Sequence, residues 1–298
     1  ANEQSEYYKA TSFWDSAIKP MISDLGEYGM ENFRSWPSAL SYFVPTYGVP
    51  GNGLTTDMMD ALGELAQAAK TRKQKQVLQR FISGENQASA DYRVALAVLK
   101  KTAPWLLERA SESNIGNPTE QFVFNGRQYS RSFLNYILGL AALSEHCDLN
   151  TINNVLEIGG GYGTLGELLY KSCDPGTMRY CNLDIPPTCA VAEYYLSEAT
   201  SSPVLGNLDK EAVDFNSGEW SLAVRPNWDI EHIKGNIDLF VNFISFQEME
   251  PAVVENYMNH VTALNPKWIL LRHIREGKQK LSETSPVGVK EPTTPDFY

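Results

Sequence analysis

The sequence has few cysteines and no long apolar run. Its 298 residues include four cysteines, and no two of them have the C-x-x-C spacing of a metal or redox site. We therefore expect reduced thiols and no disulfide framework. No apolar stretch approaches the ~20 residues that a membrane helix needs, and the polar N-terminal residues are not typical of a signal peptide. These absences predict a cytoplasmic protein without a membrane partner.

Positive charge is also scarce. The chain has 25 Lys and Arg against 36 Asp and Glu, a formal net charge of −11. Because nucleic-acid binding depends on Lys and Arg that neutralise phosphates, this balance argues against a nucleic-acid partner. The one basic stretch, Lys70 to Lys75, lies inside a helical pattern, and we interpret it as a solvated helix face rather than a phosphate site.

Two regions of the chain differ in their predicted secondary structure. Residues 1–118 are expected to form a helical N-terminal region, and residues 119–298 a second domain. Apolar residues recur at helical spacing in the first region, for example at Leu62, Leu65, Ala66 and Ala69. The predicted boundary is the polar, Gly- and Pro-containing break from Ser111 to Pro118.

After this break, short apolar strands alternate with helices. The expected strands are Asn154–Ile158, Tyr180–Ile185, Ser221–Arg225, Ile237–Ile244 and Trp268–Ile274. Strands separated by helices form a parallel sheet with helices on both faces. The sequence therefore predicts an α/β fold with a Rossmann-like sheet, preceded by a helical N-terminal region.

A glycine-rich loop follows the first of these strands. Val155 to Gly163 has the sequence V-L-E-I-G-G-G-Y-G, so the strand is followed by glycines and then by a helix. Glycines permit positive φ and close approach of the backbone to a ligand, and a helix N-terminus presents free N–H groups. This arrangement is typical of a site for a nucleotide-like ligand.

Two frames of the loop favour different ligands. Gly161 to Gly166 satisfies the dinucleotide pattern G-x-G-x-x-G, but this frame begins two residues after the strand ends. The frame that abuts the strand is Glu157-x-Gly159-x-Gly161-x-Gly163. A carboxylate there would repel a pyrophosphate, whereas S-adenosyl-L-methionine is cationic and has no phosphate. The charge favours S-adenosyl-L-methionine, with an NAD(P)-dependent Rossmann oxidoreductase as the alternative.

An acid also ends the second strand. Asp184 at this tip can accept hydrogen bonds from both ribose hydroxyls. Dinucleotide folds use an acid in the same place, so Asp184 supports a ligand with a ribose without choosing between the two. Its alternative role is a cap for the helix that follows Pro186 and Pro187.

Several stretches together have a family resemblance. They are Val155–Gly163, Leu183–Pro186, Pro226–Trp228 and Asp238–Met249, with Asn32–Arg34 and Ser130–Tyr136 upstream. In these stretches the chain resembles the class I S-adenosylmethionine-dependent methyltransferases, and most closely the sugar O-methyltransferase family. The resemblance covers most of the chain. The glycine loop is specific for the superfamily, and Ser245 to Met249 for the subgroup.

The resemblance implies a class I methyltransferase sheet with the cofactor along the carboxyl ends of strands one to four. The glycines would face the methionine portion, Asp184 the ribose, and Asn227 and Trp228 the adenine. Asn207 or Asp209 competes for the adenine role if Pro203–Gly206 is the third strand. The residues expected to hold the cofactor are Glu157, Gly159, Gly161, Gly163, Asp184, Asn227, Trp228, Asn242, Ser245 and Tyr129.

Two parts of the family pattern leave questions open. The pattern ends in an antiparallel hairpin, but only Arg275 to Tyr298 follow the fifth strand, so either the last strands are short and irregular or the chain stops early. The element before the first strand carries Tyr129, Asn135 and Tyr136. A polar residue there could close the pocket, although a role in covering the sheet is at least as well supported.

Methyl transfer to a hydroxyl is an in-line displacement. The hydroxyl must lie ~3 Å from the methyl group and lose its proton as the bond forms. A base is therefore expected at the carboxyl end of the fourth or fifth strand. Glu248 lies in the stretch that is most specific for the resembled family. His273 has the more suitable unperturbed pKa for a base, and Gln247 is better suited to orienting a hydroxyl.

No cluster of side chains suggests a metal site. Metal-dependent catechol methylation uses carboxylates after the fourth strand, where this chain has Asn242, Ser245 and Gln247. We therefore predict a metal-independent O-methyltransferase acting on a sugar or glycosylated small molecule, as in natural product or polysaccharide biosynthesis. The N-terminal helices would form a lid or a homodimer surface. A catalytically silent methyltransferase-like binding protein is the remaining alternative.

Overall fold

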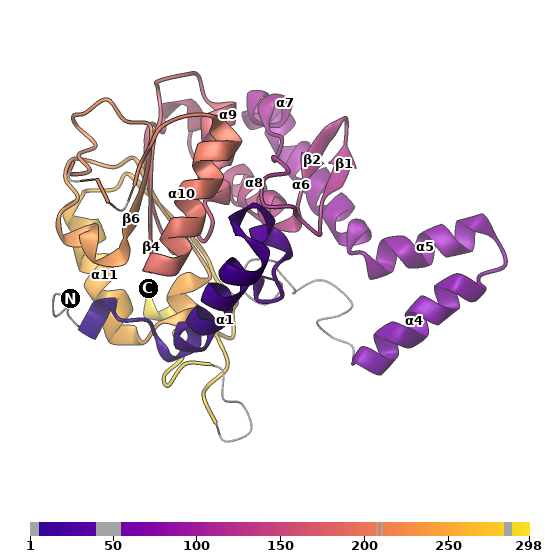
Figure 1. The fold of residues 1–298 in the computed structure, drawn as a ribbon. Helices are drawn as coiled ribbons and strands as arrows, with labels where there is room; N and C mark the ends of the chain where they lie inside the picture. Colours follow the sequence, from indigo (N-terminus) through magenta and orange to yellow (C-terminus); the bar gives the residue numbers. More distant parts are fainter. Residues whose placement is uncertain (1–5, 40–54, 207, 210, 283–287) are drawn as a thin grey trace.

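A parallel β-sheet forms the centre of the protein (Figure 1). The computed structural model describes residues 6–39, 55–206, 208–209, 211–282 and 288–298. Within these residues the sheet has six strands, in the order β5-β6-β4-β3-β7-β8, and all neighbours are parallel. The strands are β3 (Asn154–Ile158), β4 (Arg179–Asp184), β5 (Val204–Leu205), β6 (Leu222–Pro226), β7 (Leu239–Phe243) and β8 (Trp268–Arg272).

Helices cover both faces of this sheet. The helices around it are α8 (Arg131–Ser144), α9 (Thr164–Ser172), α10 (Pro186–Thr200) and α11 (Pro251–Ala263). Alternate residues of a strand point to opposite faces. Accordingly, Val155 joins the apolar cluster of α8, α9 and α10, whereas Leu156 joins the cluster of α11. The predicted α/β fold is confirmed.

The five strands predicted from the sequence are all present, within two residues at each end. Leu222–Pro226 is the strand beside β4, whereas Val204–Leu205 is an edge strand beyond it. The strand next to β4 is therefore the one that Asn227 follows, and not the one that Asp209 follows. Asn207, the other alternative for the adenine role, lies outside the described residues. The terminal antiparallel hairpin that the resemblance implies is not found in the described part of the chain, where β8 is followed only by an isolated bridge between Lys280 and Val289.

The N-terminal region is helical, as predicted. Its helices are α1 (Ser12–Tyr28), α4 (Thr56–Ala68), α5 (Arg72–Ile82), α6 (Glu85–Thr102) and α7 (Pro104–Arg109), with the short 3-10 helices η1 (Glu6–Tyr8) and η2 (Met30–Ser35). One apolar cluster joins residues on both sides of residue 118, among them Leu99, Leu106, Ile137 and Val155. The described chain therefore shares one core across the predicted boundary, which stays a prediction.

A small antiparallel hairpin leads into the sheet domain. It consists of β1 (Phe122–Phe124) and β2 (Arg127–Tyr129), joined by Asn125 and Gly126. Both turn residues have positive φ, 49° and 76°. Asn-Gly is the pair that a two-residue turn of this kind favours, because asparagine and glycine adopt positive φ at low cost.

A buried ion pair within the N-terminal region contacts the sheet domain. Arg34 Nη2 lies 2.6 Å from Glu112 Oε1, and both side chains are buried. The same carboxylate accepts hydrogen bonds from the backbone N–H and hydroxyl of Ser130, the N-cap of α8. Arg34 also lies over the ring of Tyr162 in the glycine loop, 5.2 Å from its centroid. One guanidinium thus connects η2, the start of α8 and the glycine loop.

This network predicts a large effect of a single substitution. Arg34→Met removes the positive charge and leaves Glu112 buried without it, so the free energy of unfolding should fall by about 3–5 kcal/mol in urea titrations. The matched control is Arg109→Met, which breaks a pair with Asp174 that is largely exposed. It should cost no more than ~1 kcal/mol. If the two variants lost the same free energy of unfolding, the buried pair would contribute no more to stability than the exposed one, contrary to this prediction.

Candidate functional site

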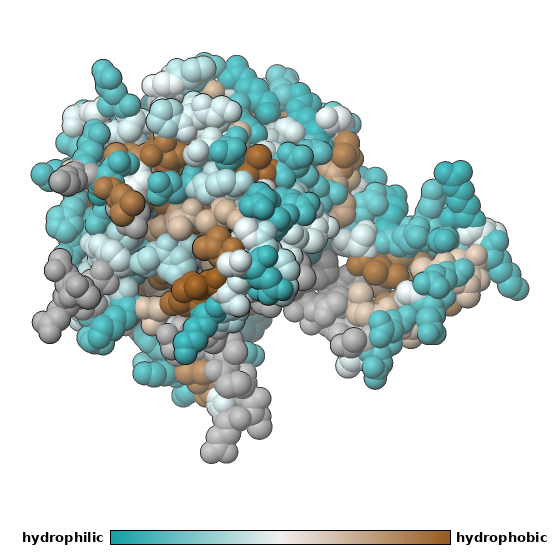
Figure 2. Space-filling view, viewed as in Figure 1, coloured by the Kyte–Doolittle hydropathy of each residue, from teal (hydrophilic) through white to brown (hydrophobic). Residues whose placement is uncertain are grey.

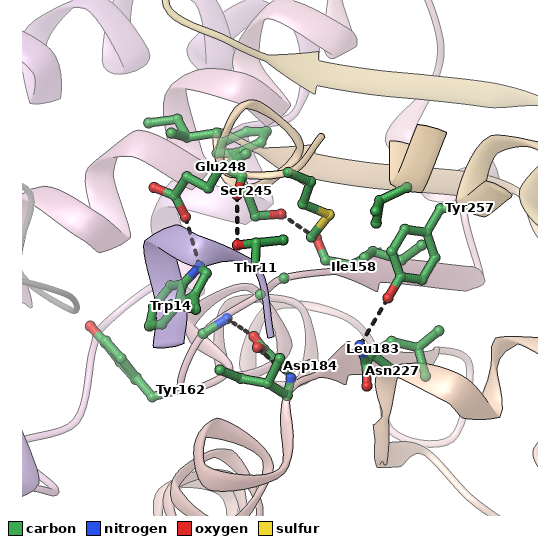
Figure 3. A pocket seen from close by; sticks show the side chains of 18 of the residues that line it. Thr11, Trp14, Ile158, Tyr162, Leu183, Asp184, Asn227, Ser245, Glu248 and Tyr257 are labelled. Atoms are coloured by element: carbon green, nitrogen blue, oxygen red, sulfur yellow. Dashed lines mark hydrogen bonds between the residues drawn. The ribbon is translucent and has the colours of Figure 1, made fainter. Parts of the chain in front are cut away.

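A cavity of about 240 Å³ lies at the carboxyl ends of the central strands (Figure 3). Ligands of open parallel sheets bind at this edge. The described residues that surround it come from the glycine loop, the strand ends, the helices α8 and α11, and the N-terminal and C-terminal segments. Those used below are Thr11, Trp14, Ser132, Asn135, Tyr136, Gly159, Gly160, Gly161, Asp184, Asn227, Ile244, Ser245, Glu248, Tyr257 and Lys278.

The glycine loop is held by the end of the neighbouring strand. The N–H of Gly159 donates to the Leu183 carbonyl at 2.7 Å, and the N–H of Gly160 donates to Asn182 Oδ1 at 3.1 Å. The N–H of Gly161 donates to Asp184 Oδ2 at 2.9 Å. Three successive loop amides therefore donate to acceptors of the protein itself.

Glycine is required in the loop for two different reasons. Gly159, Gly161 and Gly163 all have positive φ, at 71°, 58° and 93°. A Cβ at Gly159 would also lie 2.1 Å from Ser245 Oγ, whereas a Cβ at Gly161 would meet nothing within 4 Å. The loop is thus packed tightly at Gly159 and is open to the cavity at Gly161. Gly163 ends the loop as the N-cap of α9.

Asp184 forms part of the cavity wall at the tip of β4. Besides the Gly161 amide it accepts the N–H of Ile185, at 2.7 Å from Oδ1. Burial raises the pKa of Asp184 to about 7, although the two backbone hydrogen bonds act in the opposite direction. A carboxylate has about four acceptor positions, so Asp184 can still accept hydrogen bonds from a ligand.

Asn227 presents an unsatisfied acceptor at the wall of the cavity. Its Nδ2 donates to the Tyr8 carbonyl and to the Tyr257 hydroxyl, both at 3.0 Å. Its Oδ1 is buried and has no hydrogen-bond partner among the described residues. Because a buried polar atom without a partner is costly, this oxygen is suited to receive a donor from a ligand.

Glu248 connects the cavity to the N-terminal segment. Its Oε2 accepts a hydrogen bond from Trp14 Nε1 at 3.0 Å, and its Oε1 lies 2.8 Å from Lys278 Nζ. The hydroxyl of Thr11 donates to the Glu248 carbonyl at 2.8 Å. Burial raises the pKa of Glu248, and Lys278 opposes this shift. Figure 3 shows Thr11 and Trp14 pointing toward Glu248, which ties this segment to the cavity.

Glu157 lies beneath the glycine loop and is not among the residues that surround the cavity. Its two oxygens accept hydrogen bonds from Tyr136, at 2.7 Å, and Tyr180, at 2.5 Å. Burial raises the pKa of Glu157 to about 7. We expected Glu157 to face the cofactor, but its carboxylate is buried behind the loop and does not line the cavity. Glu157 supports the loop from behind, through the two tyrosines.

Asn242 and Ser245 form a linked pair after β7. Asn242 is fully buried, outside the cavity, and its Nδ2 donates to the Ile158 carbonyl and to Ser245 Oγ, at 2.8 Å and 2.7 Å. Ser245 itself contributes to the cavity wall. Between them Ile244 has φ 71°, which is strained for a β-branched residue. This strained turn brings Ser245 against Gly159.

Two of the expected catalytic residues lie away from the cavity. His273 packs against the ring of Tyr298, with centroids 4.8 Å apart, and burial lowers its pKa to about 4. Gln247 is fully buried and exchanges two hydrogen bonds of 2.7 Å with the backbone of Ile274. Neither side chain belongs to the cavity wall, so among the three candidates only Glu248 is positioned there.

Two of the expected cofactor residues also lie elsewhere. Trp228 packs against the apolar cluster on the α11 face of the sheet. Tyr129 is fully buried among the rings of Tyr92, Phe124 and Phe133. Trp228 follows β6 and Tyr129 is the last residue of β2, and both bury their aromatic rings in a core rather than in the cavity.

The sequence did not predict the cavity residues that come from the N-terminal and C-terminal segments. Thr11, Trp14 and Lys278 carry no local motif, and all three line the cavity and contact Glu248. Asn135 and Tyr136, considered as residues that close the pocket, do line it. In the described residues no group of three His, Cys, Asp or Glu side chains could hold a metal ion. The described helices include none long and apolar enough to span a membrane.

The fold and the cavity define an α/β protein with a Rossmann-like parallel sheet and a ligand site at its carboxyl edge. No family model matches the sequence, and no curated protein matches it either. Similar solved structures include N,N-8-amino-8-demethyl-D-riboflavin dimethyltransferase from Streptomyces davawensis, with 13% identity, a TM-score of 0.29, and coverage of 85% of this chain and 50% of that one. This chain thus spans half the length of that protein.

Two further solved structures are similar at the same level. Mitomycin 7-O-methyltransferase has 12% identity and a TM-score of 0.32, with coverage of 91% of this chain and 84% of that one. A pyocyanin biosynthetic protein has 12% identity and a TM-score of 0.30, with coverage of 86% and 72%. Such distant likeness does not assign a function, which must come from the chemistry of the site.

The two kinds of glycine in the loop predict different costs of substitution. Gly161→Ala should lose about 1–2 kcal/mol of the free energy of unfolding, because alanine is strained at positive φ. Gly159→Ala should lose a further ~1–3 kcal/mol, because its methyl group overlaps Ser245. Urea titrations measure both, and Ser245→Gly in the Gly159→Ala background should recover the difference. Equal losses at the two glycines would refute the close packing of Gly159.

Proposed function

We propose that the protein is an S-adenosyl-L-methionine-dependent methyltransferase of class I. The observation that carries this proposal is the state of the loop amides. Gly159, Gly160 and Gly161 donate to acceptors of the protein, and Gly161 donates to the carboxylate of Asp184. A dinucleotide site needs loop amides free to bind a pyrophosphate. Here a carboxylate takes the place that a phosphate would need, which disfavours the NAD(P)-dependent alternative.

The residues present fit this cofactor. Asp184 can accept hydrogen bonds from ribose hydroxyls, and the unsatisfied Oδ1 of Asn227 suits an exocyclic adenine amine. The open side of Gly161 leaves room for the methionine portion. The carboxylate of Asp184 suits a cationic ligand, whereas the charge of Glu248 is already paired with Lys278. When bound, the cofactor would supply an electrophilic methyl group.

Glu248 is the residue that we assign to the acceptor hydroxyl. Trp14 and Lys278 fix the two oxygens of its carboxylate, so its orientation is set before a substrate arrives. Burial raises its pKa, which makes the carboxylate a stronger base than an exposed glutamate. It would accept the proton that the hydroxyl loses. This step needs no metal ion.

For the acceptor we propose a sugar or a glycosylated small molecule. The cavity wall contains short polar side chains, namely Thr11, Ser132 and Asn135, and also the ring of Trp14. Several separated hydrogen-bonding groups next to an aromatic face suit a ligand with many hydroxyls and an apolar ring face. A catalytically silent binding protein would keep the cofactor site but release no demethylated cofactor, which separates the two by experiment.

The cofactor assignment predicts selective binding. Titration calorimetry should detect S-adenosyl-L-methionine and S-adenosylhomocysteine and no NADH. Asp184→Asn should raise the Kd of S-adenosyl-L-methionine and of S-adenosylhomocysteine by about ten- to a hundredfold, because a hydrogen bond to a charged group contributes about 1.5–3 kcal/mol. Asp174→Asn, at an exposed position, is the matched control and should bind as the wild type does. Binding of NADH alone would overturn the assignment.

The base assignment predicts a loss of turnover without a loss of cofactor binding. Mass spectrometry would first identify an acceptor that gains one methylene unit, and release of S-adenosylhomocysteine would then measure kcat. Glu248→Gln should lower kcat by about 10²–10⁴-fold, with the cofactor Kd nearly unchanged. His273→Asn is the control, because His273 lies outside the cavity, and should keep full turnover. A fully active Glu248→Gln variant would exclude Glu248 as the base.

A further inference from the structure

Two N-terminal helices form an arm that projects from the body of the protein (Figure 1). The arm consists of α4 and α5, which pack against each other, and α5 continues into α6. Both helices have well-formed starts. Thr55 caps α4, and Thr71 forms a capping box with Gln74 at the start of α5. The sequence therefore specifies the arm locally, and its projection is not a consequence of weak helix signals.

The arm leaves large apolar side chains in solvent. Leu65 of α4 and Val77 of α5 are 55% and 57% exposed, and Met58 and Phe81 are exposed as well. In Figure 2 a hydrophobic patch lies along the arm between hydrophilic borders. Helical spacing groups these residues, since Met58 and Leu65 are seven apart on α4, and Val77 and Phe81 four apart on α5. An amphipathic helix pair with its apolar side uncovered normally has a partner.

The charges on the two helices are of opposite sign. Between Thr56 and Ala68 the charged residues are Asp57, Asp60 and Glu64, all acidic. Between Arg72 and Ile82 they are Arg72, Lys73, Lys75 and Arg80, all basic. Basic residues in the first turn oppose the helix dipole, so Arg72 and Lys73 do not serve the stability of α5. Their placement instead suits an acidic neighbour, which α4 provides within the arm and the α4 of a second copy would provide across it.

We infer that the arm binds the arm of a second copy of this chain, with α4 of each copy against α5 of the other. A two-fold interface requires a surface that is complementary to itself. An acidic helix beside a basic helix meets that requirement, because a two-fold rotation pairs each with its opposite. The apolar residues between them would form the core of a four-helix bundle. A nucleic acid would match α5 but would be repelled by α4 and by a chain of net charge −11.

The two helices are also of similar length. With 13 and 11 residues, α4 and α5 are about 20 and 16 Å long at 1.5 Å per residue. Antiparallel arms can therefore pair along their whole length without leaving an unmatched end. This inference does not depend on the proposed function, because none of these residues belongs to the cavity.

The first test is the mass of the full chain in solution. Sedimentation equilibrium and light scattering at micromolar concentrations should give twice the chain mass of 33.3 kDa. Leu65→Asp combined with Val77→Asp should raise the dissociation constant on the order of a hundredfold, because it buries charges in the core of the interface. The control is Val123→Asp, at a position of β1 that is 65% exposed, which should leave the dimer intact.

The second test uses charge reversal and does not rely on changes to the apolar residues. One variant carries Asp57→Lys, Asp60→Lys and Glu64→Lys, and the other carries Arg72→Glu, Lys73→Glu and Lys75→Glu. Each alone should be monomeric, because its two helices then carry the same sign. Mixed in equal amounts, they should form a heterodimer, which also demonstrates that both are folded.

Three results would overturn the inference. They are a monomeric wild type at these concentrations, a dimer that persists in the Leu65→Asp/Val77→Asp variant, and a mixture of the charge variants that stays monomeric. Binding of the arm to a different protein would not rescue the inference in any of these cases, because each result excludes a second copy as the occupant.

Discussion

The site depends on one interaction, the hydrogen bond from the Gly161 amide to the carboxylate of Asp184. It joins the tip of β4 to the glycine loop and sets the conformation of both. The amides of Gly159 and Gly160 are also bound to neighbouring acceptors, and Gly161 has open space at its Cα. A ligand therefore meets acceptors and free space. That polarity, more than the glycine pattern, separates a cationic, phosphate-free cofactor from a dinucleotide.

The fold was predictable because its signals are local. The sequence pattern predicted β3, β4, β6, β7 and β8 within two residues at each end, and Asp184, Ser245 and Glu248 were correctly expected near strand ends. Which way a side chain points at a strand end is not local. Gln247 and Glu248 are neighbours in one 3-10 turn, yet Gln247 is turned toward the backbone of Ile274 and Glu248 toward the cavity. Only the packing of the C-terminal segment and of the N-terminal segment decides between them.

Glu157 shows a different limit of sequence reasoning. The sequence placed an acid beside the glycine loop, but its partners could not be read from the pattern. Tyr136 comes from α8 and Tyr180 from β4, and both hydroxyls donate to Glu157. A buried carboxylate needs such donors, and burial still raises its pKa to about 7. The acid thus lies close behind Gly160, bonded to two tyrosines, and is not part of the cavity wall.

The N-terminal segment completes the site from a great distance along the chain. Trp14 and Glu248 are 234 residues apart, and the Tyr8 carbonyl holds Asn227 in the same way. The segment therefore contacts two residues of the cavity wall, Asn227 after β6 and Glu248 after β7. The carboxylate that we propose as the base is also the one that accepts the hydrogen bond of Trp14, so the N-terminal segment helps to fix the orientation of that carboxylate.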